Sequence, residues 1–241
     1  MNEQRILLAG AAGAIGSALV PLLQQAGYQV HGTTRRADRA AELERAGVVP
    51  VMVDVYDASA LAAALMRTAP VVVVHQLTDL PLDLDPKLMP AAQIANARLR
   101  DEGTRNLVAA AMAAGCTRMV AQSVAWAYLP GPRPLVEDSP LDEKGMRGVV
   151  ALEHAVLRTP GLSGTVLRYG RLYGPRTSTM VAPNTIPLHV EAAAWGALLA
   201  VQRHKAGAFN MAEDSELLSS AKARRELGWS PSLRLPQQVV A

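Results

Sequence analysis

Three glycines spaced three residues apart near the start of the chain constrain its fold more than any other feature. Gly10, Gly13 and Gly16 follow an apolar run over residues 7–9 and lead into a helical pattern that begins at Ala14. A strand, a tight turn and a helix in this order place backbone amides at the helix start, where they can face an anionic ligand. The first glycine makes the turn, the second admits a pyrophosphate, and the third lets the helix pack on the strand. A second strand about twenty residues later favours a dinucleotide site over an ordinary strand–helix turn.

Composition narrows the class of protein further. The chain has 241 residues, of which 50% are hydrophobic and 4% aromatic, so we expect one domain, with at most a small appendage, around an aliphatic core. The net charge of +3, with scattered arginines, argues against a nucleic-acid partner. The single cysteine, Cys116, excludes an intrachain disulfide and fits a reducing compartment. The first strand follows the N-terminus too closely for a signal peptide, and no apolar run is long enough for a membrane span, so we expect a soluble cytoplasmic protein.

Apolar runs that alternate with helical patterns predict a parallel α/β sheet. Strands are expected over residues 5–9, 28–33, 48–53, 70–74, 118–122, 164–168 and 208–211. Helices are expected over residues 14–26, 39–46, 59–67, 91–114, 149–158, 190–203 and 219–227. Residues 81–90, 129–148 and 170–187 are expected to be loop-rich, and the C-terminal tail to have little capacity to pack. We therefore predict a Rossmann-type doubly wound sheet over residues 1–170 and a small substrate lobe over residues 171–241, interleaved with it.

Ligands of such a sheet bind beyond the carboxyl ends of its strands, which selects the candidate site. The second strand ends in Thr34, Arg35 and Arg36, where an acidic residue would bind the ribose hydroxyls of NAD. Two guanidinium groups suit a phosphate, so we expect NADP(H) over NAD(H), with solvated helix-start arginines as the alternative. Asp54 is assigned to the adenine or to a helix cap. The predicted cofactor-binding residues are Gly10, Ala12, Gly13, Ala14, Ile15, Gly16, Thr34, Arg35, Arg36, Asp54, Val55 and His75.

Further motifs extend this pattern along nearly the whole chain. They comprise Val73-Val74-His75, Gly103-Thr104-Arg105-Asn106-Leu107, Gln122-Ser123, the run Leu-Arg-Tyr-Gly-Arg-Leu-Tyr-Gly-Pro over residues 167–175, residues 188–191 and residues 223–229. Together with the glycine motif, they resemble the extended short-chain dehydrogenase/reductase superfamily, the NAD-dependent epimerase/dehydratase-like proteins. The resemblance implies a nicotinamide dinucleotide cofactor and says little about the substrate.

The resemblance also implies an acid–base pair that this chain lacks. The family uses a tyrosine and a lysine four residues apart, and the lysine lowers the tyrosine pKa for proton exchange with the substrate. Aligning Leu152-Glu153 with the family's glutamate puts Gly145 and Val149 at these two positions, and no Tyr-x-x-x-Lys occurs in the chain. Arg100 stands where the family often has an asparagine.

Three functions are compatible with an intact cofactor motif and a missing proton relay. We expect an NADP(H)-dependent oxidoreductase acting on a small carbonyl or alcohol substrate, with Ser123 or Tyr128 as the replacement catalytic group. The alternatives are an NADP-binding regulator or scaffold without turnover, and a non-redox isomerase or cyclase. Each hydroxyl also has a structural alternative, because Ser123 could cap a backbone group and Tyr128 could pack in the pocket wall.

Later strand ends are assigned to the substrate. The predicted contacts are Thr78, Tyr169, Arg171, Tyr173 and His189. Arg171 suits an anion or a carbonyl group, and equally a structural ion pair. No metal site is predicted, because the five histidines are scattered.

The family's nucleotide-sugar enzymes usually have a longer C-terminal lobe than the stretch after Tyr173, so the resemblance implies a smaller substrate than a nucleotide sugar. By resemblance we expect a homodimer through the helices over residues 91–114 and 149–158.

Overall fold

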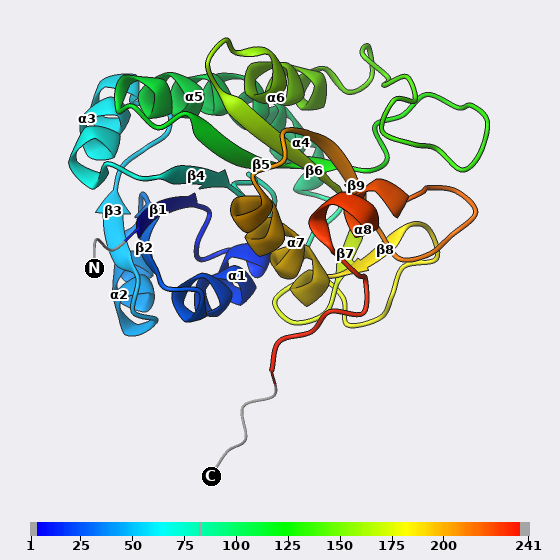
Figure 1. Cartoon of the computed structure of the whole chain (residues 1–241), viewed down its shortest axis with the longest axis horizontal. Coiled ribbons are helices and arrows are strands. Elements are labelled where there is room, and N and C mark those ends of the chain that lie inside the picture. The colour runs from blue at the N-terminus through cyan, green and yellow to red at the C-terminus, as the bar shows by residue number, and fades with distance from the viewer. Residues whose placement is uncertain (1–3, 82, 237–241) are drawn as a thin grey trace.

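A computed structural model describes residues 4–81 and 83–236 of the chain. Within these ranges the main sheet has seven parallel strands in the order β3–β2–β1–β4–β5–β6–β9 (Figure 1). Its strands are β1 (Gln4–Ala9), β2 (Tyr28–Thr34), β3 (Val49–Met52), β4 (Val72–His75), β5 (Arg118–Val124), β6 (Ser163–Tyr169) and β9 (Gly207–Met211). The strand order reverses between β1 and β4, which confirms the predicted doubly wound Rossmann sheet and creates a switch point for a ligand.

Helices cover both faces of this sheet. They are α1 (Ala14–Gln25), α2 (Ala37–Arg45), α3 (Ala58–Thr68), α4 (Met89–Arg98), α5 (Thr104–Ala113), α6 (Arg147–Arg158), α7 (Val190–Arg203) and α8 (Ala221–Leu227). Helices α3, α5 and α6 lie along one face, and α1 and α7 lie on the other (Figure 1). Strand β4 is a run of three valines and a histidine, all buried, because a central parallel strand is covered on both sides.

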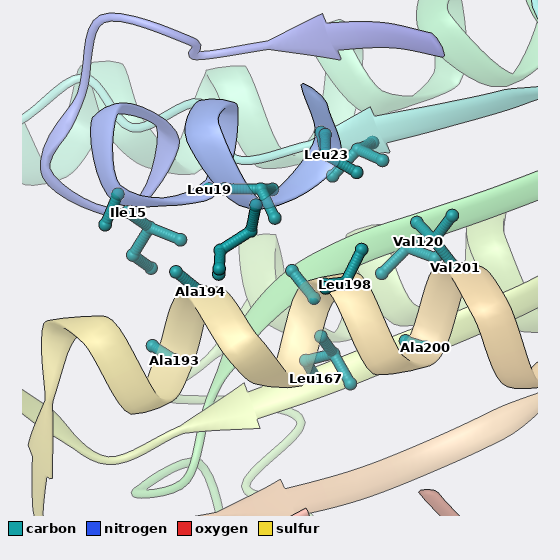
Figure 2. Close-up of a cluster of buried hydrophobic side chains, with 14 of the residues drawn as sticks. Ile15, Leu19, Leu23, Val120, Leu167, Ala193, Ala194, Leu198, Ala200 and Val201 are labelled. Atoms are coloured by element: carbon teal, nitrogen blue, oxygen red, sulfur yellow. The ribbon is translucent and has the colours of Figure 1, made fainter. Parts of the chain in front are cut away.

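Small residues let α7 approach α1 and the sheet closely. Ala193, Ala194 and Ala200 of α7 are completely or almost completely buried. In Figure 2 Ala194 and Leu198 of α7 lie on the side toward Ile15 and Leu19 of α1, with Val120 and Leu167 of the sheet beside the helix. This packing fixes the first turn of α1 against the strand ends, where the cofactor motif lies.

Three sequence expectations need correction. The helix expected over residues 91–114 is divided into α4, a π-helical turn η1 (Leu99–Gly103) and α5. The loop-rich segment over residues 170–187 contributes to a separate two-stranded sheet of β7 (Arg171–Tyr173) and β8 (Pro187–His189). The C-terminal tail does pack, because Leu233 and Leu235 contact the core and Trp195 Nε1 donates to the Arg234 carbonyl at 3.0 Å. Residues 237–241 of the tail lie outside the described residues.

Candidate cofactor site and active centre

The turn between β1 and α1 requires glycine at two positions for steric reasons. Gly10 has φ of +95°, and a Cβ there would lie 2.6 Å from the Gln76 carbonyl oxygen. A Cβ on Gly16 would lie 2.1 Å from the Gly10 carbonyl oxygen. A Cβ on Gly13 would meet only that same oxygen, at 3.3 Å, so its other sides are open. Gly10 and Gly16 therefore close the turn, and Gly13 leaves room for a close-lying ligand.

The first turn of α1 fits an anionic ligand. Gly13 is its N-cap and supplies no side-chain acceptor, and this turn contains no acidic residue. The amides of Ala14 and Ile15 therefore have no capping partner, and they carry the positive end of the helix dipole. A hollow of about 350 Å³ adjoins them, lined by Ala12, Gly13, Ala14, Arg39, Glu42 and Arg176. This site fits the diphosphate of a nicotinamide dinucleotide, because it combines uncapped amides, free space beside Gly13 and two guanidinium groups.

Neither of these two arginines, Arg39 and Arg176, was predicted from the sequence to bind the cofactor. Arg176 Nη2 donates to the Ala12 carbonyl at 3.2 Å and to Glu42 Oε1 at 3.1 Å. Arg39 Nη1 contacts the same carboxylate at 2.5 Å. Two guanidinium groups thus share one carboxylate, which leaves a net positive charge beside the helix N-terminus. Arg176 is 164 residues from Ala12 in sequence, and no local signal connects them.

The predicted phosphate-binding residues lie at the end of β2. Arg36 is two-thirds exposed and pairs with Asp38, and Arg35 lies 3.5 Å from Asp54 across the neighbouring strand end. Thr34 Oγ1 accepts from the Arg36 amide at 3.1 Å, which holds this turn. Asp54 does not cap α3, because Asp57 does so by accepting from the Ala60 amide at 2.9 Å.

Val55 and His75, also predicted to bind the cofactor, are buried. Val55 packs in the core between the sheet and α3, and its carbonyl accepts from Asn106 Nδ2 at 2.9 Å. His75 Nε2 lies 3.0 Å from Thr104 Oγ1, and its Nδ1 accepts from the Leu77 amide at 3.3 Å. Burial, helped by the charge of Arg100, lowers the pKa of His75 to about 4. His75 is therefore a neutral group that fixes the end of β4.

Because His75 is buried and neutral, we expect the free energy of unfolding to fall in mild acid. An unfolded histidine takes up its proton near pH 6.5, whereas folded His75 does so near pH 4. The unfolded state binds more protons between these values, so the free energy of unfolding should fall as pH drops from about 6.5 to about 4, by up to about 3 kcal/mol. Urea unfolding of the wild type and His75→Gln across this range should show a smaller pH slope in the variant. Equal slopes would contradict the assignment.

Ser123 and Tyr128 belong to a buried polar network. Glu153 and Arg168, each 5% exposed, form an ion pair with an Oε2–Nη2 distance of 2.6 Å. The Ser123 hydroxyl donates to Glu153 Oε1 at 2.6 Å. The Tyr128 hydroxyl accepts from Arg168 Nη1 at 2.7 Å and donates to Asn210 Oδ1 at 2.6 Å. The catalytic assignment of these hydroxyls stays a prediction, and the structure gives both a structural role.

Gly145 and Val149, the positions that the resemblance aligns with the family's acid–base pair, carry no group that transfers a proton. Val149 is buried in an apolar cluster with Val124 and Ala127. Gly145 lies just before α6, where its amide donates to Asp142 Oδ1 at 2.9 Å. A lysine ammonium at position 149 would need a polar partner, and this cluster is made of apolar side chains.

The predicted substrate residues are spread over several environments. Tyr169 is buried and its hydroxyl lies 3.4 Å from Gln76 Nε2, and burial raises its pKa. Within the described ranges, Gln76 Oε1 is the one fully buried side-chain polar atom without a hydrogen-bond partner. Thr78 is exposed, and Arg171 lies over the Trp126 ring at 5.0 Å.

Tyr173 and His189 come together on the small β7–β8 sheet. Their rings meet edge to face with centroids 5.1 Å apart. The Tyr173 hydroxyl donates to Glu213 Oε1 at 2.6 Å. His189 is the N-cap of α7, where Nδ1 accepts from the Glu191 amide at 3.3 Å, so the alternative of helix-start hydrogen bonding holds for it.

Two further findings bear on the class of protein. Across residues 4–81 and 83–236, no three His, Cys, Asp or Glu side chains gather as a metal ion would require. In the same part of the chain, none of the helices has the length and apolar character needed to span a bilayer.

Comparisons with known proteins agree with this geometry. A family model described as NAD(P)H-binding matches residues 10–188. A 3-diazoavenalumate denitrifying reductase from a Streptomyces species is 38% identical over 263 residues, covering 96% of this chain and 84% of that protein.

Solved structures match along most of their length. UDP-glucose 4-epimerase from Thermotoga maritima has a TM-score of 0.77 and 19% identity, covering 95% of this chain and 94% of that one. A dTDP-glucose 4,6-dehydratase from Streptomyces venezuelae, also with a TM-score of 0.77, is 20% identical and covers 96% of this chain and 93% of that one. At these identities the likeness shows the fold.

Proposed function

Because the chain belongs to the NAD(P)H-binding, extended short-chain dehydrogenase/reductase superfamily, we propose that it is a reductase of a small diazo-substituted aromatic carboxylate. The observation that carries this proposal is the 38% identity to a diazo-compound reductase over 96% of the chain. The glycine turn, the uncapped α1 amides and the guanidinium groups of Arg39 and Arg176 support a nicotinamide cofactor.

The missing proton relay favours this substrate over a carbonyl compound. Reduction of a carbonyl group produces an alkoxide that must be protonated, which is the task of an acid–base pair. A bound NAD(P)H would supply a hydride to a diazonium cation, so that a C–H bond forms, the C–N bond breaks, and its electron pair leaves on N₂ without any proton being consumed. Gly145, the buried Val149 and the network-bound Ser123 and Tyr128 are compatible with such a reaction.

Isotope transfer tests this function directly. Purified protein is incubated with an aromatic diazonium carboxylate and NADPH carrying deuterium at either face of nicotinamide C4, against a protein-free baseline. We expect N₂ and NADP⁺ in equal amounts and deuterium at the carbon that lost nitrogen, from one face only. Turnover of a panel of aldehydes and ketones, with none of the diazonium compound, would favour the carbonyl reductase instead. Tight cofactor binding without any turnover would favour the regulator.

We also propose that NADP(H) is preferred over NAD(H). Replacing both Arg35 and Arg36 with alanine should lower the ratio of NADPH to NADH affinity by about 10- to 100-fold. Only NADPH carries the ribose phosphate, so only its binding loses the hydrogen bonds from the two guanidinium groups. Dissociation constants from the quenching of protein fluorescence provide the measurement. Arg45→Ala, an exposed arginine on α2, is the control. An unchanged ratio in the double variant would refute the assignment.

A homodimer through α5 and α6 is proposed as well. A hollow of about 910 Å³ lies between them, in which apolar residues such as Val108, Met112 and Val150 are flanked by charged ones such as Glu143 and Arg147. Light scattering after size exclusion should give twice the chain mass for the wild type. Val150→Asp should give the monomer mass, because an unpaired charge in an apolar interface opposes association. A monomeric wild type would contradict the proposal.

A further inference from the structure

The charges on the helix that follows β4 are paired with one exception. Arg98 contacts Glu102 at 2.7 Å, and Arg105 contacts Asp101 at 2.8 Å, both at helical i,i+4 spacing. Arg100 lies between these pairs. The two acidic side chains of η1, Asp101 and Glu102, both pair with other arginines. Within the described residues Arg100 therefore has no carboxylate at ion-pair distance, and it makes no side-chain hydrogen bond.

Arg100 is also placed toward the candidate active centre. Asn96 and Thr104, four residues before and after it, both contact the segment that ends β4. Asn96 Oδ1 accepts from the Asp79 amide at 2.9 Å, and Thr104 Oγ1 lies 3.0 Å from His75 Nε2. Side chains four residues apart share one helix face, so Arg100 faces the carboxyl end of β4 as well. Its charge acts on the His75 ring, which fits this position.

The surroundings of Arg100 suit an anion brought by a ligand. The side chain is largely covered by protein. Burial lowers its pKa, because a cation with little water around it and no counter-charge is destabilised. The Arg100 nitrogens are not sealed from solvent. Within the described ranges Gln76 Oε1 is the side-chain atom that is both fully buried and without a hydrogen-bond partner, so the unpartnered Arg100 nitrogens keep some solvent contact. The π-helical turn η1 that carries Arg100 is a form that often occurs at functional sites.

We propose that Arg100 binds the carboxylate of the substrate and thereby selects aromatic acids over their neutral analogues. A planar guanidinium binds a carboxylate through two parallel hydrogen bonds, which orients the ligand as well as holding it. The α1 amides, with Arg39 and Arg176, would bind the diphosphate of the cofactor, and α1 lies on the opposite face of the sheet from η1. The identity of the substrate rests on the proposed function, whereas the charge selection is tested separately.

Equilibrium binding tests the role without turnover. The protein is saturated with NADP⁺, and calorimetry measures its affinity for 4-hydroxycinnamate and for the methyl ester of that acid. We expect the wild type to bind the acid about 10- to 100-fold more tightly than the ester, as a charge-assisted hydrogen-bond pair implies. Arg100→Gln should remove this preference by weakening binding of the acid far more than binding of the ester, and Arg100→Lys should keep part of it. Arg105→Gln, which removes the same charge from the adjoining helix, should behave as the wild type.

The possible outcomes separate the alternatives. A wild type without acid preference, or an Arg100→Gln variant that keeps it, overturns the proposal. An Arg100→Gln variant that loses affinity for NADP⁺ while keeping the acid preference also overturns it, and assigns the guanidinium to a cofactor phosphate. Arg100-dependent acid binding together with no turnover of diazonium acids supports the proposal and overturns the proposed function alone.

Discussion

Replacing Glu153 with glutamine is expected to lower the free energy of unfolding by about 3–5 kcal/mol, the cost of leaving one partner of a buried ion pair alone. Arg168 is 5% exposed and donates to Glu153 at 3.0 and 2.6 Å, so its charge has no route to water when the carboxylate is lost. Ser123 loses its charged acceptor in the same variant. Urea unfolding followed by circular dichroism measures the change.

Glu44→Gln is the matched control for this effect. Glu44 is exposed near the end of α2, and the free energy of unfolding should change by less than about 0.5 kcal/mol, as is usual for surface substitutions. A Glu153→Gln variant as stable as this control would show that the network around Arg168 does not hold α6, β5 and β6 together.

This network explains why the fold was easier to predict from sequence than the active centre. Period and composition identify strands and helices because each element needs only its own apolar face. The glycine spacing identifies the turn, although the steric need for glycine at position 10 comes from the Gln76 carbonyl beyond β4. The roles of Ser123 and Tyr128 depend on Glu153, Arg168 and Asn210, which approach them only in the folded sheet. A hydroxyl at a strand end has the same sequence signature whether it faces a substrate or a buried carboxylate.

One long-range contact and one helix boundary account for the differences between the predicted and the observed cofactor site. Arg176 reaches the glycine turn from a distant loop, and Asp57 rather than Asp54 caps α3 because the helix begins one residue after it. The interruption at η1 has no glycine or proline signal at its start, so a continuous helix was the natural prediction. It matters because it carries Arg100.

Replacing Gly13 with alanine should weaken NADPH binding by about 10-fold or more while leaving the protein folded. Gly13 has φ of −78°, which any residue adopts, and an added Cβ meets only the Gly10 carbonyl oxygen, at 3.3 Å. The cost to folding is therefore small, whereas the methyl group occupies the space beside the uncapped α1 amides, where a diphosphate would lie. Fluorescence titration with NADPH and thermal unfolding of the same preparation measure the two quantities separately.

Gly27→Ala separates this local effect from the general cost of losing a glycine. Gly27 has φ of +86°, and no atom lies within 4 Å of the position that an added methyl group would take. Its replacement should therefore cost about 1 kcal/mol of stability through backbone strain and leave NADPH binding intact. The two variants predict opposite patterns, with binding lost and stability kept at position 13, and stability reduced and binding kept at position 27. Equal cofactor affinities in both would show that the diphosphate does not lie against this turn, and the dinucleotide assignment would lose its structural basis.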